Sequence, residues 1–261
     1  MTTDPTPRLQ HDRQHDIYLL ALRQGSVDVA DLAQRYGVTT ETIRRDLTVL
    51  ERHGVLRRVH GGAIPVERLG FEPTLSVRET VMTDEKERIA RAALAELPPE
   101  SGTILLDAGS TTARLADALP VDRELTVVTH SVNIALTLIT RPNVTVMLVG
   151  GRLRSKTLAS VDAWALQALR DTFVEVAFIA TNGISVERGL TTPDPAEAMV
   201  KKAAIGAGRR CVLLADHTKV GNDHFARFAD LGDIDTFITD KDVDDEVAAE
   251  IEAAGPKVIT T

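Results

Sequence analysis

The sequence has one cysteine among 261 residues, and aromatic residues make up only 3% of it. A lone Cys211 cannot form an intramolecular disulfide, which indicates a reducing compartment. With few aromatic residues, the core must be built from Ala, Val, Leu and Ile. No apolar run approaches the roughly 18–20 residues of a membrane span, and residues 1–10 lack the apolar segment of a signal peptide. We therefore expect a soluble, cytoplasmic protein with no membrane partner.

Residues 1–65 contain nine arginines, no lysine and eight acidic residues, so basic and acidic residues nearly balance there. The whole chain, by contrast, has a net charge of −8. Five of these arginines lie in 42–61, accompanied by only two acidic residues. A local basic patch on an acidic chain is typical of a small element that contacts nucleic acid. A solvated helix face gives the same pattern, so charge alone does not decide.

Apolar spacing predicts three helices in 1–65, over about 13–24, 29–36 and 40–53, with Gly25 closing the first. Asp28 is the expected N-cap of the second helix, and Thr39 or Thr40 that of the third. The third helix places apolar residues on one face and polar residues on the other, as a DNA-recognition helix does. The apolar stripe is Ile43, Leu47 and Leu50, and the polar face holds Thr40, Arg44 and Thr48 beside Glu41 and Arg45.

Alternating apolar and basic residues over 55–60, followed by two glycines, predict a β-hairpin wing. Arginines on a wing contact phosphates and set the register, whereas arginines on a recognition helix read base edges. The alternative is a three-helix domain that binds protein rather than DNA.

Residues 66–83 lack clear periodicity, and Pro65 and Pro73 interrupt any long helix. We expect an interdomain linker here, with a new helix that starts with Thr83 as its N-cap. The predicted organisation is a winged helix-turn-helix in 1–65, a linker in 66–83 and an effector-binding domain in 84–261.

After residue 100, short apolar segments alternate with helical patterns. This alternation predicts a doubly wound parallel sheet with helices on both faces, in the α/β class. The predicted strands are 103–106, 125–129, 144–149, 174–180, 211–215, 236–239 and 257–260, and the predicted helices are 111–119, 131–140, 162–171, 195–208 and 243–253. Such sheets bind ligands beyond the carboxyl ends of their strands.

The loop 107–112, with sequence Asp-Ala-Gly-Ser-Thr-Thr, follows the first strand and leads into a helix N-terminus. Free amide groups at such a turn can hold a phosphate. On its own the loop is a weak signal, because many strand-helix turns contain Gly and Ser. Glu197 and Lys201 are four residues apart, a spacing typical of a surface ion pair.

Two sets of motifs resemble the DeoR family of transcriptional regulators. In the first 65 residues they are 31–33, 37–39, 42–47, 50–51, 54 and 60–63, and in the remainder they are 107–112, 128–131, 150–151, 182–184, 189–191, Glu197 with Lys201, 214–219 and 238–240. The resemblance covers nearly the whole chain. It implies a helix-turn-helix over about 31–51, with the wing 60–62 at the DNA.

The resemblance, together with the patterns above, assigns two sets of site residues. Those predicted to lie at double-stranded operator DNA are Thr40, Thr42, Arg44, Arg45, Arg57, Arg58, His60 and Gly61. Those predicted to bind an effector are Asp107, Gly109, Ser110, Thr111, Thr112, Lys156, Asn182, Glu197, Lys201 and Lys219. By the resemblance, 109–112 and Lys219 would hold a phosphate. The residues nearer the sugar hydroxyls would be Asp107, Asn182, Glu197 and Lys201.

The resemblance implies a second domain similar in fold to ribose-5-phosphate isomerase and glucosamine-6-phosphate deaminase, answering to a phosphorylated sugar. The expected function is a sugar-operon repressor, acting as a homodimer or homotetramer and released from DNA by that sugar. Fructose 1-phosphate is the first expectation, because 156–161, Trp164 and 189–194 look most like actinobacterial regulators of fructose uptake.

The sequence leaves two alternatives to a repressor open. An isomerase-like enzyme with an appended DNA-binding domain would use Asp107, Glu197 and Lys201 for proton transfer, although no Asp-Gly-Ala-Asp-Glu-like run is present. The second alternative is an activator or a protein-binding adaptor, which would differ from a repressor in its effect on the promoter.

We expect no cofactor, and no metal site, because the histidines form no ligand cluster with cysteine. Many family members have glycine where this chain has Asp162. We expect Asp162 to cap the helix that contains Trp164, with selection of the sugar as the alternative.

Overall fold

The computed structural model describes residues 10–261 except 25, 53–54, 60, 66–71 and 100. The chain forms two compact units, one up to Val81 and one from Met82 onward, and each is described by itself. In the described part of the chain, no helix is both long and apolar enough to cross a membrane.

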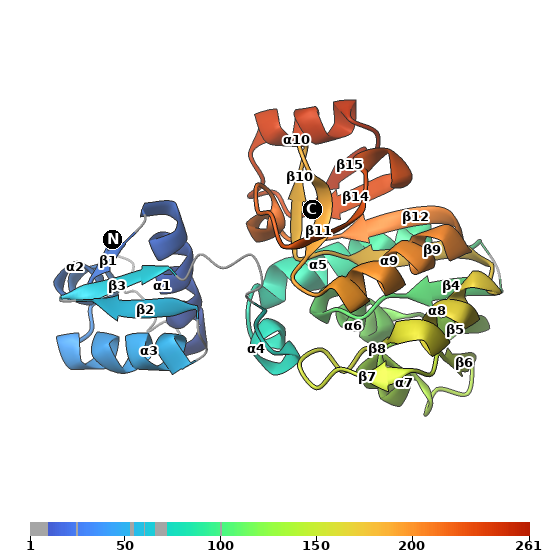
Figure 1. The fold of residues 1–261 in the computed structure, drawn as a ribbon, viewed down its shortest axis with the longest axis horizontal. Helices are drawn as coiled ribbons and strands as arrows, with labels where there is room; N and C mark the ends of the chain where they lie inside the picture. The colour runs from blue at the N-terminus through green and yellow to red at the C-terminus, as the bar shows by residue number, and fades with distance from the viewer. Residues whose placement is uncertain (1–9, 25, 53–54, 60, 66–71, 100) are drawn as a thin grey trace. The chain divides into compact units, whose positions relative to one another are not determined.

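The first unit is a winged helix-turn-helix (Figure 1). Its helices are α1 (Gln10–Gln24), α2 (Val29–Tyr36) and α3 (Thr40–Arg52), and its strands are β1 (Val27–Asp28), β2 (Leu56–Val59) and β3 (Gly62–Pro65). The strands form an antiparallel sheet in the order β1-β3-β2, so the predicted three helices and wing are confirmed. Gly25 and the predicted helix end at His53 lie outside the described residues.

Local hydrogen bonds explain where these helices begin. The Asp28 carboxylate accepts from the Ala30 amide at 2.7 Å, which caps α2 as predicted. The Thr39 hydroxyl accepts from the Thr42 amide at 3.2 Å and caps α3. Gly37, with φ 63°, ends α2 in the left-handed conformation that glycine adopts without strain. The two helices therefore meet at a fixed turn.

The segment before the second unit contains a helix that the sequence did not predict. Residues Leu75–Glu79 form α4, inside the expected linker. The next helix, α5 (Thr83–Ala93), begins at the expected residue, but its N-cap is Met82 with φ 54°, and no side chain caps it. The prediction that Thr83 is the N-cap was therefore wrong.

The second unit is built on seven parallel strands in the order β15-β14-β12-β9-β4-β5-β6. In sequence order they are β4 (Gly102–Leu106), β5 (Leu125–Thr129), β6 (Val144–Leu148), β9 (Val174–Ala180), β12 (Gly208–Leu214), β14 (Thr236–Thr239) and β15 (Lys257–Thr260). The predicted parallel α/β sheet is confirmed, and each predicted strand lies within three residues of its observed bounds.

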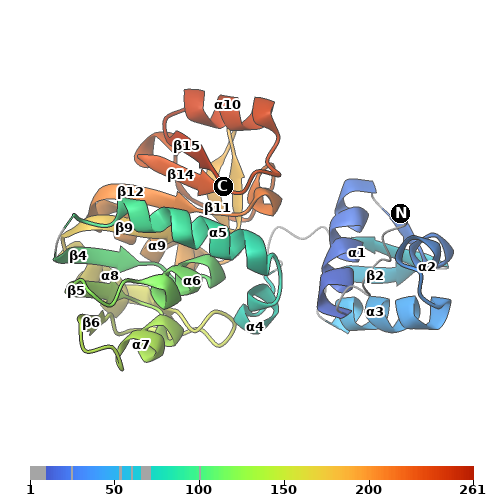
Figure 2. The ribbon, with the colours of Figure 1, turned by 180° about the vertical axis from the view of Figure 1, so that it is seen from behind.

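Helices cover both faces of this sheet. Neighbouring residues of a strand point to opposite faces, so each strand contributes side chains to both layers. On one face, Ile104 and Leu106 pack with α5, α6 (Ser110–Ala118) and α7 (Val132–Leu138). On the other face, Leu105 belongs to the core formed with α8 (Asp162–Arg170), α9 (Pro195–Ala207) and α10 (Asp245–Ala253). Figures 1 and 2 show these two layers from opposite sides.

The strand order reverses between β4 and β9. From β4 the chain adds β5 and β6 on one side, and it then returns to place β9, β12, β14 and β15 on the other. Such a switch point opens a crevice beyond the carboxyl ends of the two strands, where ligands of doubly wound sheets bind. The residues that follow β4 and β9 are therefore the first place to look for a site.

Two small sheets were not predicted. Strands β10 (Gly183–Ser185), β11 (Gly189–Thr192) and β13 (Ala226–Ala229) form an antiparallel sheet after β9 and β12. Strands β7 (Arg152–Leu153) and β8 (Ser160–Val161) form a hairpin after β6. Both lie beyond carboxyl ends of the main strands, and both contribute to the surroundings of the candidate site.

Candidate functional site

The outer face of α3 presents two arginines. The side chains of Arg44 and Arg45 are 54% and 78% exposed, and each lies 3.8 Å from the Glu41 carboxylate. The opposite face of α3 is buried through Ile43 and Leu47. The helix thus packs on one side and leaves guanidinium groups free to approach a DNA groove on the other.

Asp46 belongs to the buried side of α3, although by sequence it counted against the basic patch. Its carboxylate accepts from Arg13 Nε at 2.6 Å and from Gln14 Nε2 at 2.8 Å, so it ties α3 to α1. Because Arg13 balances its charge inside the unit, Asp46 does not reduce the basic character of the exposed face. No sequence pattern indicates the pairing of Arg13 with Asp46, which are 33 positions apart.

The wing continues the basic face. Arg57 and Arg58 are exposed on β2, and the Arg58 guanidinium donates to the Thr48 hydroxyl at 3.4 Å. Gly61, with φ 80°, forms the exposed turn of the hairpin, whereas the predicted contact His60 lies outside the described residues.

The two predicted threonines of α3 are placed differently. Thr40 is exposed, whereas Thr42 is half-buried with its hydroxyl 3.0 Å from that of Thr39. Thr42 therefore supports the start of α3, and Thr40 is the more accessible of the two.

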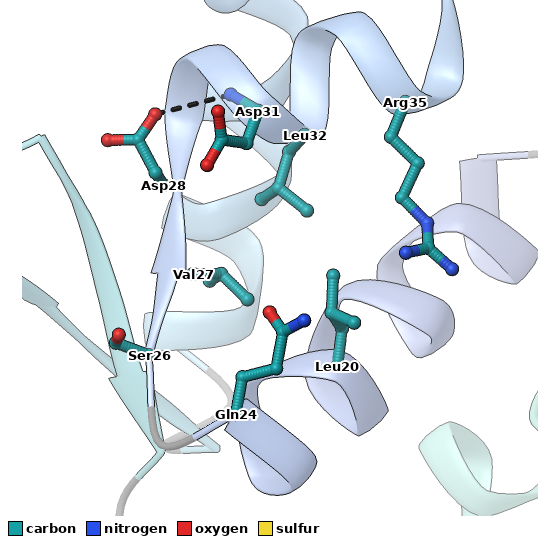
Figure 3. Close-up of a pocket in the computed structure, with 8 residues that line it drawn as sticks. All are labelled: Leu20, Gln24, Ser26, Val27, Asp28, Asp31, Leu32 and Arg35. Carbon is teal, nitrogen blue, oxygen red and sulfur yellow. Dashed lines mark hydrogen bonds between the residues drawn. The ribbon is translucent and has the colours of Figure 1, made fainter.

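A surface hollow of about 480 Å³ lies between α1, β1 and α2, and no residue of α3 lines it (Figure 3). Its lining combines apolar side chains with the carboxylates of Asp28 and Asp31, and Asp28 is engaged in capping α2. Carboxylates repel phosphate, so this hollow does not suit the DNA backbone. Its lining residues are Leu20, Gln24, Ser26, Val27, Asp28, Asp31, Leu32 and Arg35.

In the second unit, Asp107 stands at the switch point, directly after β4, and is fully buried. One carboxylate oxygen lies 2.8 Å from His130 Nε2. The other accepts from the Ala180 amide at 2.9 Å and from the Lys201 ammonium, which also donates to the Ala180 carbonyl at 2.9 Å. The carboxylate thus joins the ends of β4, β5 and β9 to α9.

Burial alone would raise the pKa of Asp107, but the Lys201 ammonium and the hydrogen bond from His130 outweigh it and lower the pKa to about 2. Asp107 is therefore ionised at neutral pH. Its carboxylate holds Lys201 in place, and its predicted role beside sugar hydroxyls stays a prediction.

The loop after Asp107 connects β4 to the start of α6. Gly109 precedes α6 in extended conformation, and no side chain caps the first turn, which begins at Ser110 and Thr111. A Cβ at Gly109 would lie 2.7 Å from the Ala180 Cβ, so glycine lets the loop pass close to β9. The Thr112 hydroxyl is bonded to the Asp107 carbonyl at 2.7 Å and shapes the loop from within.

Glu197 and Lys201 are not the surface ion pair that their spacing favoured. Both are buried on α9, and they pair with different partners. Lys201 pairs with Asp107, whereas Glu197 accepts from Arg154 Nη1 at 2.5 Å and from the Thr157 hydroxyl. The structure thus brings together Asp107 and Lys201 directly, and Glu197 one helical turn away.

The remaining predicted effector residues are more separate. Lys156 is exposed, two residues beyond Arg154. Asn182 follows β9, and its side-chain oxygen accepts from the Thr192 hydroxyl at 3.0 Å. Lys219 follows β12 and is half-buried, with its ammonium 3.3 Å from the Thr218 hydroxyl.

Beside Lys219, the end of β12 carries a second group of charges. Burial raises the pKa of Asp216, but Lys219 and Lys86 outweigh it and lower the pKa to about 2. His217 Nδ1 lies 2.7 Å from an Asp240 oxygen, and the hydrogen bond raises the pKa of His217. Asp242 lies beside this pair, so that His217, Asp240 and Asp242 bring three potential metal-ligand atoms within 4.8 Å of one another.

Asp162 is not the N-cap of α8, contrary to our expectation. The N-cap is Val161, and Asp162 is the first helical residue, with φ 74° and an ion pair to Arg152 Nε at 2.5 Å. A positive φ strains most side chains but not glycine. The glycine typical of the family at this position therefore fits the backbone itself.

Three residues that contact the predicted set were not assigned to it from the sequence, namely His130, Arg154 and Thr157. His130 follows β5 directly, so the rule that ligand-facing residues follow parallel strands could have found it. Arg154 and Thr157 lie in a hairpin whose short strands left no periodic signal. Their contacts with Glu197 depend on tertiary structure alone.

An exposed basic helix and wing in one unit, and an α/β domain with a buried charged cluster at its switch point in the other, define a DNA-binding regulator with a sensing domain. A family model of the DeoR-like helix-turn-helix domain matches residues 13–68, and one of the DeoR C terminal sensor domain matches residues 81–241. The chain belongs to the DeoR family of transcriptional regulators.

Curated relatives match over most of their length. The HTH-type transcriptional regulator GlpR of Haloferax volcanii is 38% identical over 251 residues, which cover 96% of this chain and 98% of that protein. The glycerol-3-phosphate regulon repressor of Escherichia coli K12 is 31% identical over 231 residues, covering 88% and 91%. These relatives are named as transcriptional regulators and not as enzymes, which favours a regulator over the isomerase-like alternative.

Among solved structures, ribose 5-phosphate isomerase A of Methanocaldococcus jannaschii aligns with a TM-score of 0.40 and 16% identity, over 53% of this chain and 55% of that one. A similarity of this size carries no argument about function. The fold assignment rests on the sheet order and on the family match.

Proposed function

We propose that the chain represses a sugar operon by binding operator DNA through α3 and the wing, and that a phosphorylated sugar in the second unit releases it. One observation carries the sensing half of the proposal. The first turn of α6 has no capping side chain and lies at the β4–β9 switch point, next to the buried Asp107–Lys201 pair. Free helix amides attract a phosphate.

The charges around the switch point favour an ester over a free sugar. Lys219 provides an accessible cation after β12, whereas Glu197 and Asn182 provide oxygen acceptors on α9 and after β9. A ligand with an anionic end and several hydroxyls uses both kinds of group. The name of the Escherichia coli relative, a glycerol-3-phosphate regulon repressor, supports a phosphorylated effector. Fructose 1-phosphate is our first candidate.

A homodimer or homotetramer would place two copies of α3 on repeated half-sites. Effector binding would favour an arrangement of the DNA-binding units that no longer matches the half-site spacing, and DNA affinity would fall.

The direct test is fluorescence anisotropy of the full chain on its own upstream DNA. The complex is titrated with fructose 1-phosphate, fructose 6-phosphate, ribose 5-phosphate, glycerol 3-phosphate and unphosphorylated fructose. We expect one ester to release the DNA and free fructose to have no effect. Specific DNA binding that no ester alters would overturn the sensing half and leave the DNA-binding half intact.

A further inference from the structure

The β7–β8 hairpin carries a loop, residues 154–159, that closes on itself. The Arg154 amide donates to the Ala159 carbonyl at 2.9 Å, and the Leu158 amide donates to the Arg154 carbonyl at 2.8 Å. Leu158 has φ 54°, which a side-chain-bearing residue adopts only where its surroundings enforce it. The Leu158 carbonyl in turn accepts from the Val132 amide at 3.0 Å, so the loop is fixed to the start of α7.

Two side chains of this loop converge on one carboxylate oxygen. Arg154 Nη1 lies 2.5 Å from Glu197 Oε1, and Arg154 Nη2 lies 3.1 Å from Asp194 Oδ2. The Thr157 hydroxyl donates to the same Glu197 Oε1. The planar guanidinium thus bridges two carboxylates, which an ammonium cannot do in the same geometry. The contacts from Arg154 and from Thr157 to Glu197 both go to Oε1, and neither uses Oε2.

The loop also reaches the switch point through two further connections. Glu197 lies one helical turn before Lys201, whose ammonium pairs with Asp107. Ser160, directly after the loop, donates its amide to the His130 carbonyl at 2.8 Å, and His130 lies 2.8 Å from Asp107. Arg154 is only 11% exposed, so its charge belongs to this buried network and not to the surface.

We propose that Arg154 and Thr157 are positioning residues for effector recognition. They fix the Glu197 carboxylate by Oε1 so that Oε2 accepts from a hydroxyl of the phosphorylated sugar. This assignment rests on the proposed function. It gives the 154–159 loop a specificity role through Arg154, in place of Lys156, which is exposed.

The test separates hydroxyl recognition from phosphate binding and from stability. Isothermal titration calorimetry of the full chain uses fructose 1-phosphate, fructose 6-phosphate, ribose 5-phosphate, glycerol 3-phosphate and inorganic phosphate as probes. Arg154→Gln is compared with Arg152→Gln, which removes the same charge and an ion pair from the exposed end of the same hairpin. Thermal unfolding identifies folded variants, and Thr157→Val serves if Arg154→Gln does not fold.

We expect Arg154→Gln to weaken the ester that binds the wild type at least tenfold, with inorganic phosphate unchanged and Arg152→Gln like the wild type. Equal loss of ester and inorganic phosphate would reduce Arg154 to a structural role and overturn the assignment. Unchanged ester binding in Arg154→Gln would overturn it as well, without touching the proposed function. If no ester binds the wild type, the proposed effector class fails and this assignment fails with it.

Discussion

The charged side chains of the two units differ in their surroundings. On α3, Arg44 and Arg45 are more than half exposed and lie at the outer limit of an ion pair with Glu41. At the switch point, Asp107 and Lys201 are buried and bonded to each other. Exposed pairs contribute about 0–1 kcal/mol to stability, whereas removing one partner of a buried pair costs about 3–5 kcal/mol.

In the first unit, the residues predicted to function are therefore different from those that stabilise the fold. In the second unit, the same residues are expected to do both. We expect that the arginines predicted to contact DNA can be exchanged without unfolding the helix that carries them, because that helix is held by Ile43, Leu47 and the Asp46 carboxylate. The charges of the candidate site hold strand ends and α9 together, so we expect changes there to alter the fold and the site at once. Four variants or conditions test this contrast, from the largest expected effect to the smallest.

Lys201→Met should have the largest effect. The change keeps the length of the side chain but leaves the Asp107 carboxylate buried without its main cation, so we expect the free energy of unfolding to fall by about 3–5 kcal/mol. Urea unfolding followed by circular dichroism measures this. Lys202→Met, one residue away and exposed, is the control. Equal effects of the two variants would show that the pair is not structurally important.

Acid should destabilise the second unit through Asp107. Its pKa is about 2 in the folded chain against an ordinary 3.8, so the carboxylate contributes stability above about pH 4 and loses it as the pH falls toward 2. The difference corresponds to about 2 kcal/mol. We expect Asp107→Asn to be less stable than the wild type at neutral pH. Because this variant has no carboxylate to protonate at position 107, its free energy of unfolding should fall less than that of the wild type between pH 5 and pH 2. Parallel pH curves for the two proteins would contradict the assigned pKa.

Arg45→Ala should affect DNA and little else. Loss of a contact to a base edge costs about 1–3 kcal/mol, so operator affinity should fall by roughly 5–150-fold. Stability should change by less than about 0.5 kcal/mol, because the side chain is 78% exposed. Arg188→Ala, an exposed arginine of the second unit, controls for net charge. Comparable loss of affinity in both variants would indicate a general charge effect instead of a specific contact.

Asp162→Gly should have the smallest effect. Glycine adopts the positive φ without strain, which stabilises the folded chain. Loss of the exposed ion pair with Arg152 and the flexibility of glycine in the unfolded chain both lower the stability. Asp162→Ala loses the same pair and keeps the strain. We expect the glycine variant to be about 1 kcal/mol more stable than the alanine variant in thermal unfolding, and the reverse order would show that the backbone there is unstrained.

Regular elements were largely predictable from the sequence, because periodicity and capping are local. The bounds of α2 match the prediction, and so do those of β5, β9, β14 and β15. The β7–β8 hairpin was missed because two-residue strands carry no periodicity. The sheet of β10, β11 and β13 was missed because its strands are short and separated by up to 33 residues of chain between β11 and β13.

The candidate site was predictable as a set of positions but not as a set of contacts. The rule that ligand-facing residues follow parallel strands locates Asp107 and Asn182. It cannot show that Lys201 pairs with Asp107, since the two residues are 94 positions apart. The same applies to Arg154 and Glu197, whose spacing of 43 residues has no signature in the sequence. Partner choice in a buried charge network depends on the packed fold.

The central claim, that the second unit controls DNA binding through a phosphorylated sugar, is tested most directly by measuring effector affinity with and without operator DNA. Coupling between two binding sites is reciprocal, so DNA must weaken effector binding by the same factor by which the effector weakens DNA binding. For the ester that releases the wild type, we expect the two factors to agree, and we expect the coupling to disappear in Lys219→Ala while operator affinity persists. Equal effector affinity in free and DNA-bound protein would contradict the account.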